Sequence, residues 1–223
     1  MKFGVVVFPG SNCDRDMMHA LERDMNAEVI PLWHKDEDLS MFEKEDCIVL
    51  PGGFSYGDYL RCGAIARFSP MMKRVINFAN DGGKVFGVCN GFQILCESGL
   101  LPGVLLRNAN MQFVCKNVYI TDSKENSQCS YKIPVAHGEG RYFAQPEILQ
   151  ELEANGQVLY KYCNDEGFIH ADYSPNGSTE NIAGICNKER NVFGMMPHPE
   201  RACSEALGNT DGRKILSSLF SIN

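Results

Sequence analysis

A cysteine between two glycines is the chemically most informative part of this sequence. Residues 87–91 have the sequence Gly-Val-Cys-Asn-Gly and directly follow an apolar run. Glycines two places before and after a reactive residue suit a sharp strand-to-helix turn, because crowding there leaves no room for side chains. Cys89 is then expected to lie exposed at a helix N-terminus, where free N–H groups and the helix dipole favour the thiolate. The pattern predicts a nucleophile that attacks carbonyl carbon.

A histidine and a glutamate between prolines could complete the catalytic group. Residues 197–200 have the sequence Pro-His-Pro-Glu. Prolines fix their own φ and hold the preceding residue extended, and in an extended segment residues i and i+2 point to the same side. His198 and Glu200 are therefore expected to project together. A carboxylate beside an imidazole orients the ring and stabilises its protonated form, so the pattern predicts a base and its orienting partner.

A second His-x-Glu pair competes with this assignment. His137 and Glu139 are separated and followed by glycines, Gly138 and Gly140. Glycines favour a flexible loop, whereas prolines fix an extended backbone. The pair at residues 198 and 200 therefore suits preorganised catalysis better. Residues 137–142 are interpreted as a loop for substrate closure or partner docking.

Composition limits the class of protein. The chain has 223 residues, of which 44% are hydrophobic and 22% charged, and suits a single α/β domain over residues 1–223. Its apolar runs are shorter than the ~18 residues of a membrane span, which predicts a soluble protein with no membrane partner. The net charge of −7 argues against nucleic-acid binding. Ten cysteines without paired spacing predict reduced thiols in the cytoplasm and no structural zinc site.

The elements that must position these residues alternate between strand and helix patterns. Continuous apolar runs typical of buried parallel strands lie at residues 3–8, 29–33, 47–50 and 84–89. Helical spacing follows the first run, with Ser11 or Asn12 as its cap, and recurs at 72–79, 92–97 and near 211–220; shorter strand-like runs and a helix from Pro146 lie between. This order predicts one open, mostly parallel sheet with flanking helices, as in flavodoxin-like folds. Ligands bind such sheets at the carboxyl ends of the strands, where Gly53 and Cys89 fall.

Five longer motifs together resemble a known family. They lie at residues 7–12, 51–59, 87–93, 137–142 and 196–201. In this order and over the whole chain they resemble the Cys-His-Glu, or triad-type, glutamine amidotransferases, and among these the family of small glutaminase subunits of phosphoribosylformylglycinamidine synthase.

The resemblance implies a reaction and assigns roles to residues. Cys89 would attack the side-chain carboxamide of glutamine, and His198 would give a proton to the departing ammonia, leaving a γ-glutamyl thioester that water hydrolyses. The backbone N–H groups of Gly53 and Asn90 would stabilise the oxyanion. Gln93 matches a position that helps to hold the substrate. The alternative interpretation is a surface or capping glutamine in the helix.

The resemblance also implies partners. The chain lacks the G-x-x-x-x-G-K-[S/T] phosphate loop. No cofactor is expected in this chain. The ammonia acceptor, formylglycinamide ribonucleotide, would be activated on a separate synthetase subunit that uses ATP and magnesium, assisted by a small accessory subunit.

Other functions are also compatible with these motifs. A glutaminase serving another ammonia acceptor, and a cysteine peptidase or redox-sensing protein on a related fold, would also place cysteine at such a turn. A flavodoxin-like binding module would use residues 9–12 to hold a phosphate. Cys62 has no base in its motif and Cys96 lies in the apolar pattern of its helix, so neither is the expected nucleophile.

Overall fold

The computed structural model describes residues 1–123 and 130–220, and within these ranges a central sheet of nine strands has the order β2-β1-β3-β4-β11-β10-β9-β6-β7. Its strands are β1 (Lys2–Val7), β2 (Glu28–Trp33), β3 (Cys47–Leu50), β4 (Lys84–Val88), β6 (Val114–Asp122), β7 (Tyr131–His137), β9 (Val158–Cys163), β10 (Ile182–Cys186) and β11 (Val192–Met195). A separate pair consists of β5 (Val104–Leu106) and β8 (Arg141–Phe143). The α-helices are α1 (Asp14–His19), α2 (Pro70–Asn80), α3 (Asn90–Glu97), α4 (Pro146–Ala154) and α5 (Asp211–Phe220).

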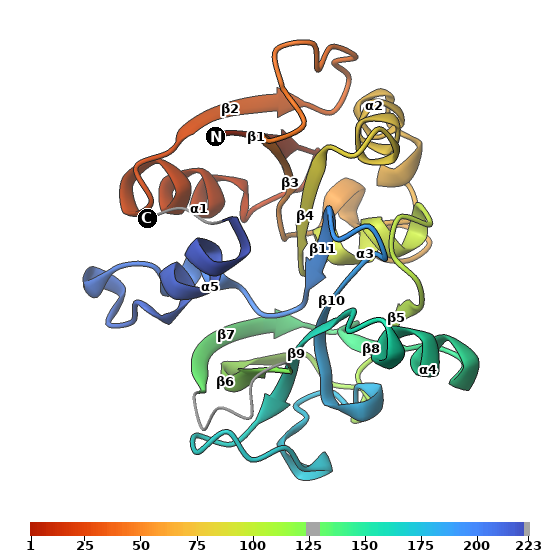
Figure 1. The fold of residues 1–223 in the computed structure, drawn as a ribbon, viewed down its shortest axis with the longest axis vertical. Helices are drawn as coiled ribbons and strands as arrows, with labels where there is room; N and C mark the ends of the chain where they lie inside the picture. Colours follow the sequence, from red (N-terminus) through yellow and green to blue (C-terminus); the bar gives the residue numbers. More distant parts are fainter. Residues whose placement is uncertain (124–129, 221–223) are drawn as a thin grey trace.

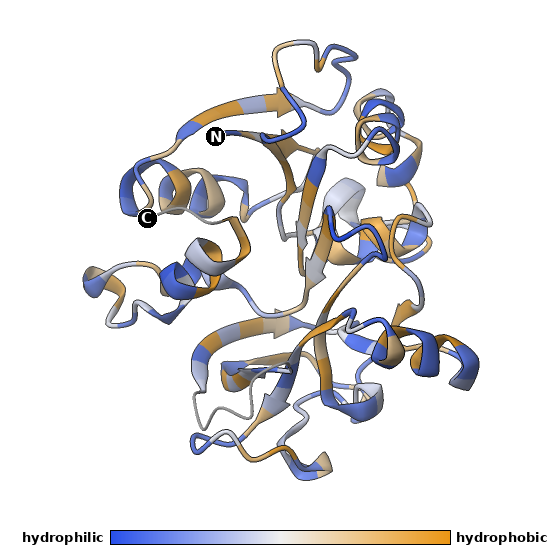
Figure 2. Ribbon diagram, in the orientation of Figure 1, coloured by the Kyte–Doolittle hydropathy of each residue, from blue (hydrophilic) through white to orange (hydrophobic). Residues whose placement is uncertain are grey.

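The first half of the sheet is parallel. Strands β2, β1, β3, β4 and β11 all run in the same direction. Figure 1 shows α1 and α5 on one side of this half and α2 and α3 on the other. Because both faces are covered, β3 is buried throughout, as its continuous apolar sequence requires. Figure 2 shows mostly hydrophobic residues along β1, β2 and β3, whereas hydrophobic and hydrophilic residues alternate along the helices.

The second half of the sheet is antiparallel. Strands β10, β9, β6 and β7 each pair antiparallel with the preceding strand in the sheet order, starting from β11. Strand β7 alternates between half-buried and buried residues along most of its length, which is the pattern of a strand with one face on the core. The predicted α/β class, with an open sheet and flanking helices, is confirmed. The sheet is mixed, and its parallel half is the one that ends at Gly53 and Cys89.

The start of the first helix differs from the prediction. The N-cap of α1 is Cys13 and makes no side-chain capping bond, so neither Ser11 nor Asn12 caps it. Ser11 instead donates through Oγ to the carbonyl of Gly52, at 3.4 Å, and Asn12 Oδ1 accepts from Cys13 Sγ, at 3.5 Å. These polar groups tie the turn to neighbouring loops. None of the helices in the described ranges is long and apolar enough to cross a membrane.

Candidate functional site

Cys89 lies on a strained turn between β4 and α3. Its backbone has φ 51° and ψ −104°, in a region that residues with side chains rarely adopt. The flanking glycines are required: a Cβ at Gly91 would lie 1.9 Å from the carbonyl oxygen of Leu50, and one at Gly87 would lie 2.7 Å from that of Gly91. The predicted turn is therefore present, but Cys89 is only 5% exposed rather than open to solvent. Its Sγ lies 3.8 Å from the carbonyl oxygen of Ala136 on β7.

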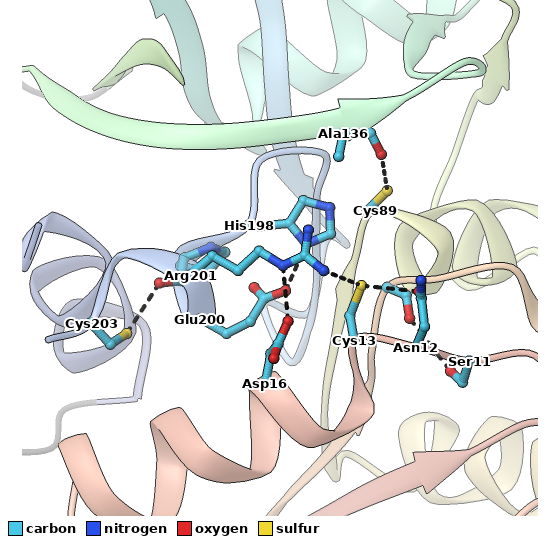
Figure 3. Close-up of polar contacts among 12 residues, drawn as sticks. Ser11, Asn12, Cys13, Asp16, Cys89, Ala136, His198, Glu200, Arg201 and Cys203 are labelled. Carbon is cyan, nitrogen blue, oxygen red and sulfur yellow. Dashed lines mark hydrogen bonds and ion pairs between the residues drawn. The ribbon is translucent and has the colours of Figure 1, made fainter. Parts of the chain in front are cut away.

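Strand β11 brings His198 to the same edge of the sheet. It runs parallel to β4 with Met195 opposite Val88, and the N–H of Cys89 donates to the carbonyl of Met195 at 2.8 Å. The N–H of His198, three residues farther on, donates to the carbonyl of Pro134 at 2.9 Å. The histidine is thus anchored between the two halves of the sheet. Figure 3 shows its ring facing Cys89.

Glu200 holds the histidine ring. The distance from His198 Nδ1 to Glu200 Oε1 is 2.6 Å, and the two side chains are 1% and 0% exposed. The expected extended segment ends at His198, because Pro199–Ala202 form a 3₁₀ turn with proline in its first turn, where a fixed φ is favourable. It is this tight turn, and not an extended rod, that returns Glu200 to the imidazole.

The charges around His198 favour its protonated form. Burial disfavours the imidazolium, but the charges of Glu200 and Cys89 outweigh burial and raise the pKa of His198 to about 10. Its Nε2 is buried and has no hydrogen-bond partner within the described residues. Because this nitrogen faces the sulfur, the pair is arranged for proton transfer between Cys89 and His198.

Two backbone N–H groups could stabilise an oxyanion next to Cys89. Asn90 begins α3, so its N–H has no carbonyl of a preceding turn to bond. Gly53 has φ +125°, and a Cβ there would lie 2.6 Å from the backbone nitrogen of Asn12. Only glycine can take this conformation in this space. Both residues lie at the carboxyl edge of the parallel strands, as predicted.

Gln93 is buried rather than at the surface of its helix. Its Oε1 accepts from Asn90 Nδ2 at 2.9 Å, and its Nε2 donates to the carbonyl of Glu139 at 2.6 Å. Asn90 Nδ2 also donates to Asp58 Oδ1 at 3.2 Å. The amide of Gln93 therefore links the nucleophile turn to the segment between β7 and β8. Burial, with Glu139 adding its charge, raises the pKa of Asp58.

The second His-x-Glu pair lies at the end of β7 and in the short connection to β8, so the expected loop over residues 137–142 is limited to residues 138–140. His137 ends β7, is 3% exposed, and its Nδ1 lies 3.1 Å from Asn108 Oδ1. A Cβ at Gly140 would lie 2.4 Å from His137 Nδ1, so the glycine allows the ring to pack. Burial, together with the nearby charge of His198, lowers the pKa of His137 to about 4. Tyr142 is fully buried, and its hydroxyl donates to the carbonyl of Pro102 at 2.9 Å.

The turn at residues 9–12 is filled by the chain itself. The N–H of Phe54 donates to the carbonyl of Gly10 at 3.3 Å, and the N–H of Tyr56 to that of Pro9 at 2.6 Å. A Cβ at Gly10 would lie 2.4 Å from the carbonyl oxygen of Phe54. Because residues 53–56 pack into this turn, a phosphate-binding role for it is not supported.

Other cysteines lack the setting of a nucleophile. Burial, and then the hydrogen bond that its Sγ donates to Asp58 Oδ2 at 3.1 Å, raise the pKa of Cys62. Burial raises the pKa of Cys96. Both thiols therefore stay protonated at neutral pH, which agrees with their exclusion as nucleophiles.

Sequence reasoning missed the residues behind His198. A Cβ at Gly52 would lie 2.7 Å from His198 Cε1 and 3.3 Å from Cys13 Sγ, so this glycine gives the ring its space. Arg201 Nη2 lies 3.1 Å from Cys13 Sγ, and Arg201 Nε donates to Asp16 Oδ2 at 3.0 Å. The only signal in the sequence was that Cys13 and Arg201 lie at or beside the motifs that carry the turn and the histidine.

Comparison with known proteins identifies relatives over the whole chain. A model of the CobB/CobQ-like glutamine amidotransferase domain matches residues 1–215. Phosphoribosylformylglycinamidine synthase subunit PurQ of Moorella thermoacetica is 52% identical over 98% of this chain and 95% of its own length. The protein of the same name from Chlorobaculum parvum is also 52% identical, over 99% of this chain and 89% of its own.

Solved structures give the same result. A chain in the structure of PurLQS from Thermotoga maritima superposes with a TM-score of 0.83 at 40% identity, covering 99% of this chain and 97% of that one. A glutamine amidotransferase from Thermotoga maritima, with a TM-score of 0.56 and 12% identity over 99% of this chain and 82% of its own, shares the fold.

Proposed function

Since the chain belongs to the CobB/CobQ-like glutamine amidotransferase family, we propose that Cys89, His198 and Glu200 are the groups with which it hydrolyses glutamine. The observation that carries the assignment is the buried Glu200–His198 pair, 2.6 Å apart, facing a cysteine on a strained turn. The whole chain acts as one amidotransferase domain.

The first half of the reaction forms a thioester. The Cys89 thiolate bonds to the carboxamide carbon of glutamine, and the carbonyl electrons move onto the oxygen. The N–H groups of Gly53 and Asn90 stabilise this oxyanion, a contribution worth about 10²–10³-fold in rate for each donor. When the intermediate collapses, the C–N bond breaks and the His198 imidazolium gives its Nε2 proton to the leaving ammonia.

The second half releases glutamate. Neutral His198 takes a proton from water, the hydroxide attacks the thioester carbon, and the Cys89 thiolate leaves. Glu200 keeps the ring in one orientation through both halves and stabilises the imidazolium. Gln93 contributes by holding the carbonyl of Glu139, and with it the β7–β8 segment, against the substrate side of the turn.

The ammonia goes to a synthetase. This chain is the glutaminase component of phosphoribosylformylglycinamidine synthase, as its relatives' names and the PurLQS structure support. The synthetase subunit converts formylglycinamide ribonucleotide to formylglycinamidine ribonucleotide in purine biosynthesis, and a small accessory subunit completes the complex. We propose that ATP and magnesium act only on the synthetase, that this chain needs no cofactor, and that the complex works in the cytoplasm.

Labelling and reconstitution test this assignment. The electrophilic glutamine analogue diazo-oxo-norleucine is expected to add covalently to Cys89 and to stop glutamate release. Addition of the synthetase and accessory subunits, with ATP, magnesium and formylglycinamide ribonucleotide, is expected to raise turnover and to give one amidine per glutamate. Labelling at another cysteine would refute the site. Cleavage of peptides in place of glutamine would favour the peptidase alternative.

A further inference from the structure

Behind the catalytic histidine, three side chains form a group of metal-binding type. Cys13, His198 and Glu200 are all buried, and each offers one ligand atom within 4.8 Å of the others. Cys13 precedes α1, whereas the other two lie at the 3₁₀ turn after β11. Thiolate, imidazole and carboxylate are the donors that Zn²⁺ takes in proteins, and three protein ligands leave one position for water.

The carboxylate contributes an independent indication of a ligand. Glu200 is 3% exposed, and its Oε1 accepts from the imidazole. Its Oε2 is buried and has no hydrogen-bond partner among residues 1–123 and 130–220. A buried carboxylate oxygen without a hydrogen bond is costly. The positive charge of Arg201 already acts on Glu200, and a metal ion bonded to Oε2 would lower the remaining cost further.

A cleft reaches one member of this group, Glu200. It has a volume of about 660 Å³ and is lined in part by Asp16, Glu200, Arg201 and Ser204. Arg201 also lines this cleft and contacts Cys13 Sγ (Figure 3). The Arg201 side chain is 33% exposed and ends in an ion pair with Asp16. Because it is partly in solvent, it can turn away from the sulfur and admit an ion.

We propose that Cys13, His198 and Glu200 bind a thiophilic divalent cation of the zinc class, and that the bound ion stops glutamine hydrolysis. The inhibition, unlike the metal binding, rests on the proposed function. The metal bonds to Cys13 Sγ, His198 Nδ1 and Glu200 Oε2, and the thiol proton and the Nδ1 proton leave to solvent. The remaining ring proton is then on Nε2, so His198 can no longer accept a proton there. Loss of base catalysis costs about 10²–10⁴-fold in rate.

Metal binding is tested without relying on activity. In a Cys89→Ala background, which removes the nucleophilic thiol as a ligand, titration calorimetry is expected to show one Zn²⁺ per chain. Co²⁺ is expected to give a thiolate-to-metal charge-transfer band. Adding Cys13→Ala should abolish the band and weaken Zn²⁺ binding by about 100-fold or more, because one of three ligands is gone. Cys13→Ser, which keeps a polar group of similar size, should do the same.

A matched control uses another free thiol. Cys115 is exposed and lies outside the group, so Cys115→Ala in the same background should bind Zn²⁺ and Co²⁺ like its parent. Equal Zn²⁺ affinity with and without Cys13, or a cobalt band that persists in Cys13→Ser, would overturn the site.

Inhibition is measured on chains that retain Cys89, each relative to its own rate without metal. Half-inhibition of Cys13→Ser should need at least about ten times more Zn²⁺ than that of the wild-type chain or Cys115→Ala, a chelator should restore the rate, and equal concentrations of Mg²⁺ should not inhibit. Zn²⁺ binding through Cys13 without inhibition would overturn the regulatory role. Absence of glutamine hydrolysis in every chain would refute the proposed function and leave the binding result intact.

Discussion

Replacing Glu200 by glutamine tests the electrostatics of the site most directly. The change keeps the size of the side chain and removes its charge. Burial alone lowers the pKa of His198, and the charges of Glu200 and Cys89 raise it to about 10. Without the carboxylate we expect this pKa to fall toward the ordinary histidine value of about 6.5. A fall of about 3.5 pH units corresponds to a loss of about 5 kcal/mol of stabilisation of the imidazolium.

The loss should appear in the rate. With the imidazole no longer oriented, and mostly neutral at pH 8, we expect kcat for glutamate release to fall by about 10³–10⁴-fold. Initial rates in an assay coupled to glutamate dehydrogenase measure kcat, and the ring nitrogen chemical shifts of His198 against pH measure its pKa. Glu205→Gln is the matched control, because Glu205 is an exposed carboxylate close by in the chain. A Glu200→Gln chain with wild-type kcat, or with its His198 pKa still near 10, would refute the reasoning.

The same substitution predicts a pH-dependent change in stability. A folded pKa raised above the unfolded value gives stability that is fully present below about pH 6.5 and is lost as the pH rises through about 10. Glu200→Gln should therefore lower the free energy of unfolding most at pH 6, and the difference from wild type should shrink toward pH 10. Urea unfolding at a series of pH values measures it, and a difference independent of pH would contradict the assigned cause.

Four further substitutions separate the roles of neighbouring groups. His198→Ala should abolish glutamine hydrolysis and His137→Ala should leave most of it, as glutamate release will show; the reverse would exchange their roles. Gly53→Ala, which places a Cβ 2.6 Å from the backbone of Asn12, should displace one oxyanion donor and lower kcat by about 10²–10³-fold with the fold intact by circular dichroism. Gln93→Leu should raise KM for glutamine about tenfold more than it lowers kcat, and an unchanged KM would exclude a role in the substrate side of the site.

The strands that lead to Gly52 and Cys89 could be predicted because their sequences suit only one environment. Residues 47–50 and 84–88 are short apolar runs that end in glycine-containing turns, and both become buried parallel strands. Strand β11 could not be found in this way. It has four residues, one of them Gly194, and it becomes a strand by pairing with β4.

Contacts between distant segments were also beyond sequence reasoning. Gly52 lies in one of the sequence motifs, residues 51–59, but the reason that it must be glycine is the ring of His198, which comes from a segment far along the chain. Cys13 was one cysteine among ten until the fold placed its sulfur beside that ring. Periodicity predicts which face of a helix or strand is buried. Only the packed structure shows which residues lie against that face.

Two buried histidines in this site have pKa shifts of opposite direction, and their hydrogen-bond partners explain the difference. Burial disfavours the charged form of both, yet the pKa of His137 is lowered to about 4 and that of His198 is raised to about 10. The local sequences are alike, since each histidine is followed by a glutamate two residues later. At His198 the 3₁₀ turn returns the carboxylate of Glu200 to the ring, whereas Nδ1 of His137 lies against the amide of Asn108. His137 therefore stays neutral at pH 7, and a neutral neighbour places no second positive charge beside the imidazolium that the proposed reaction needs.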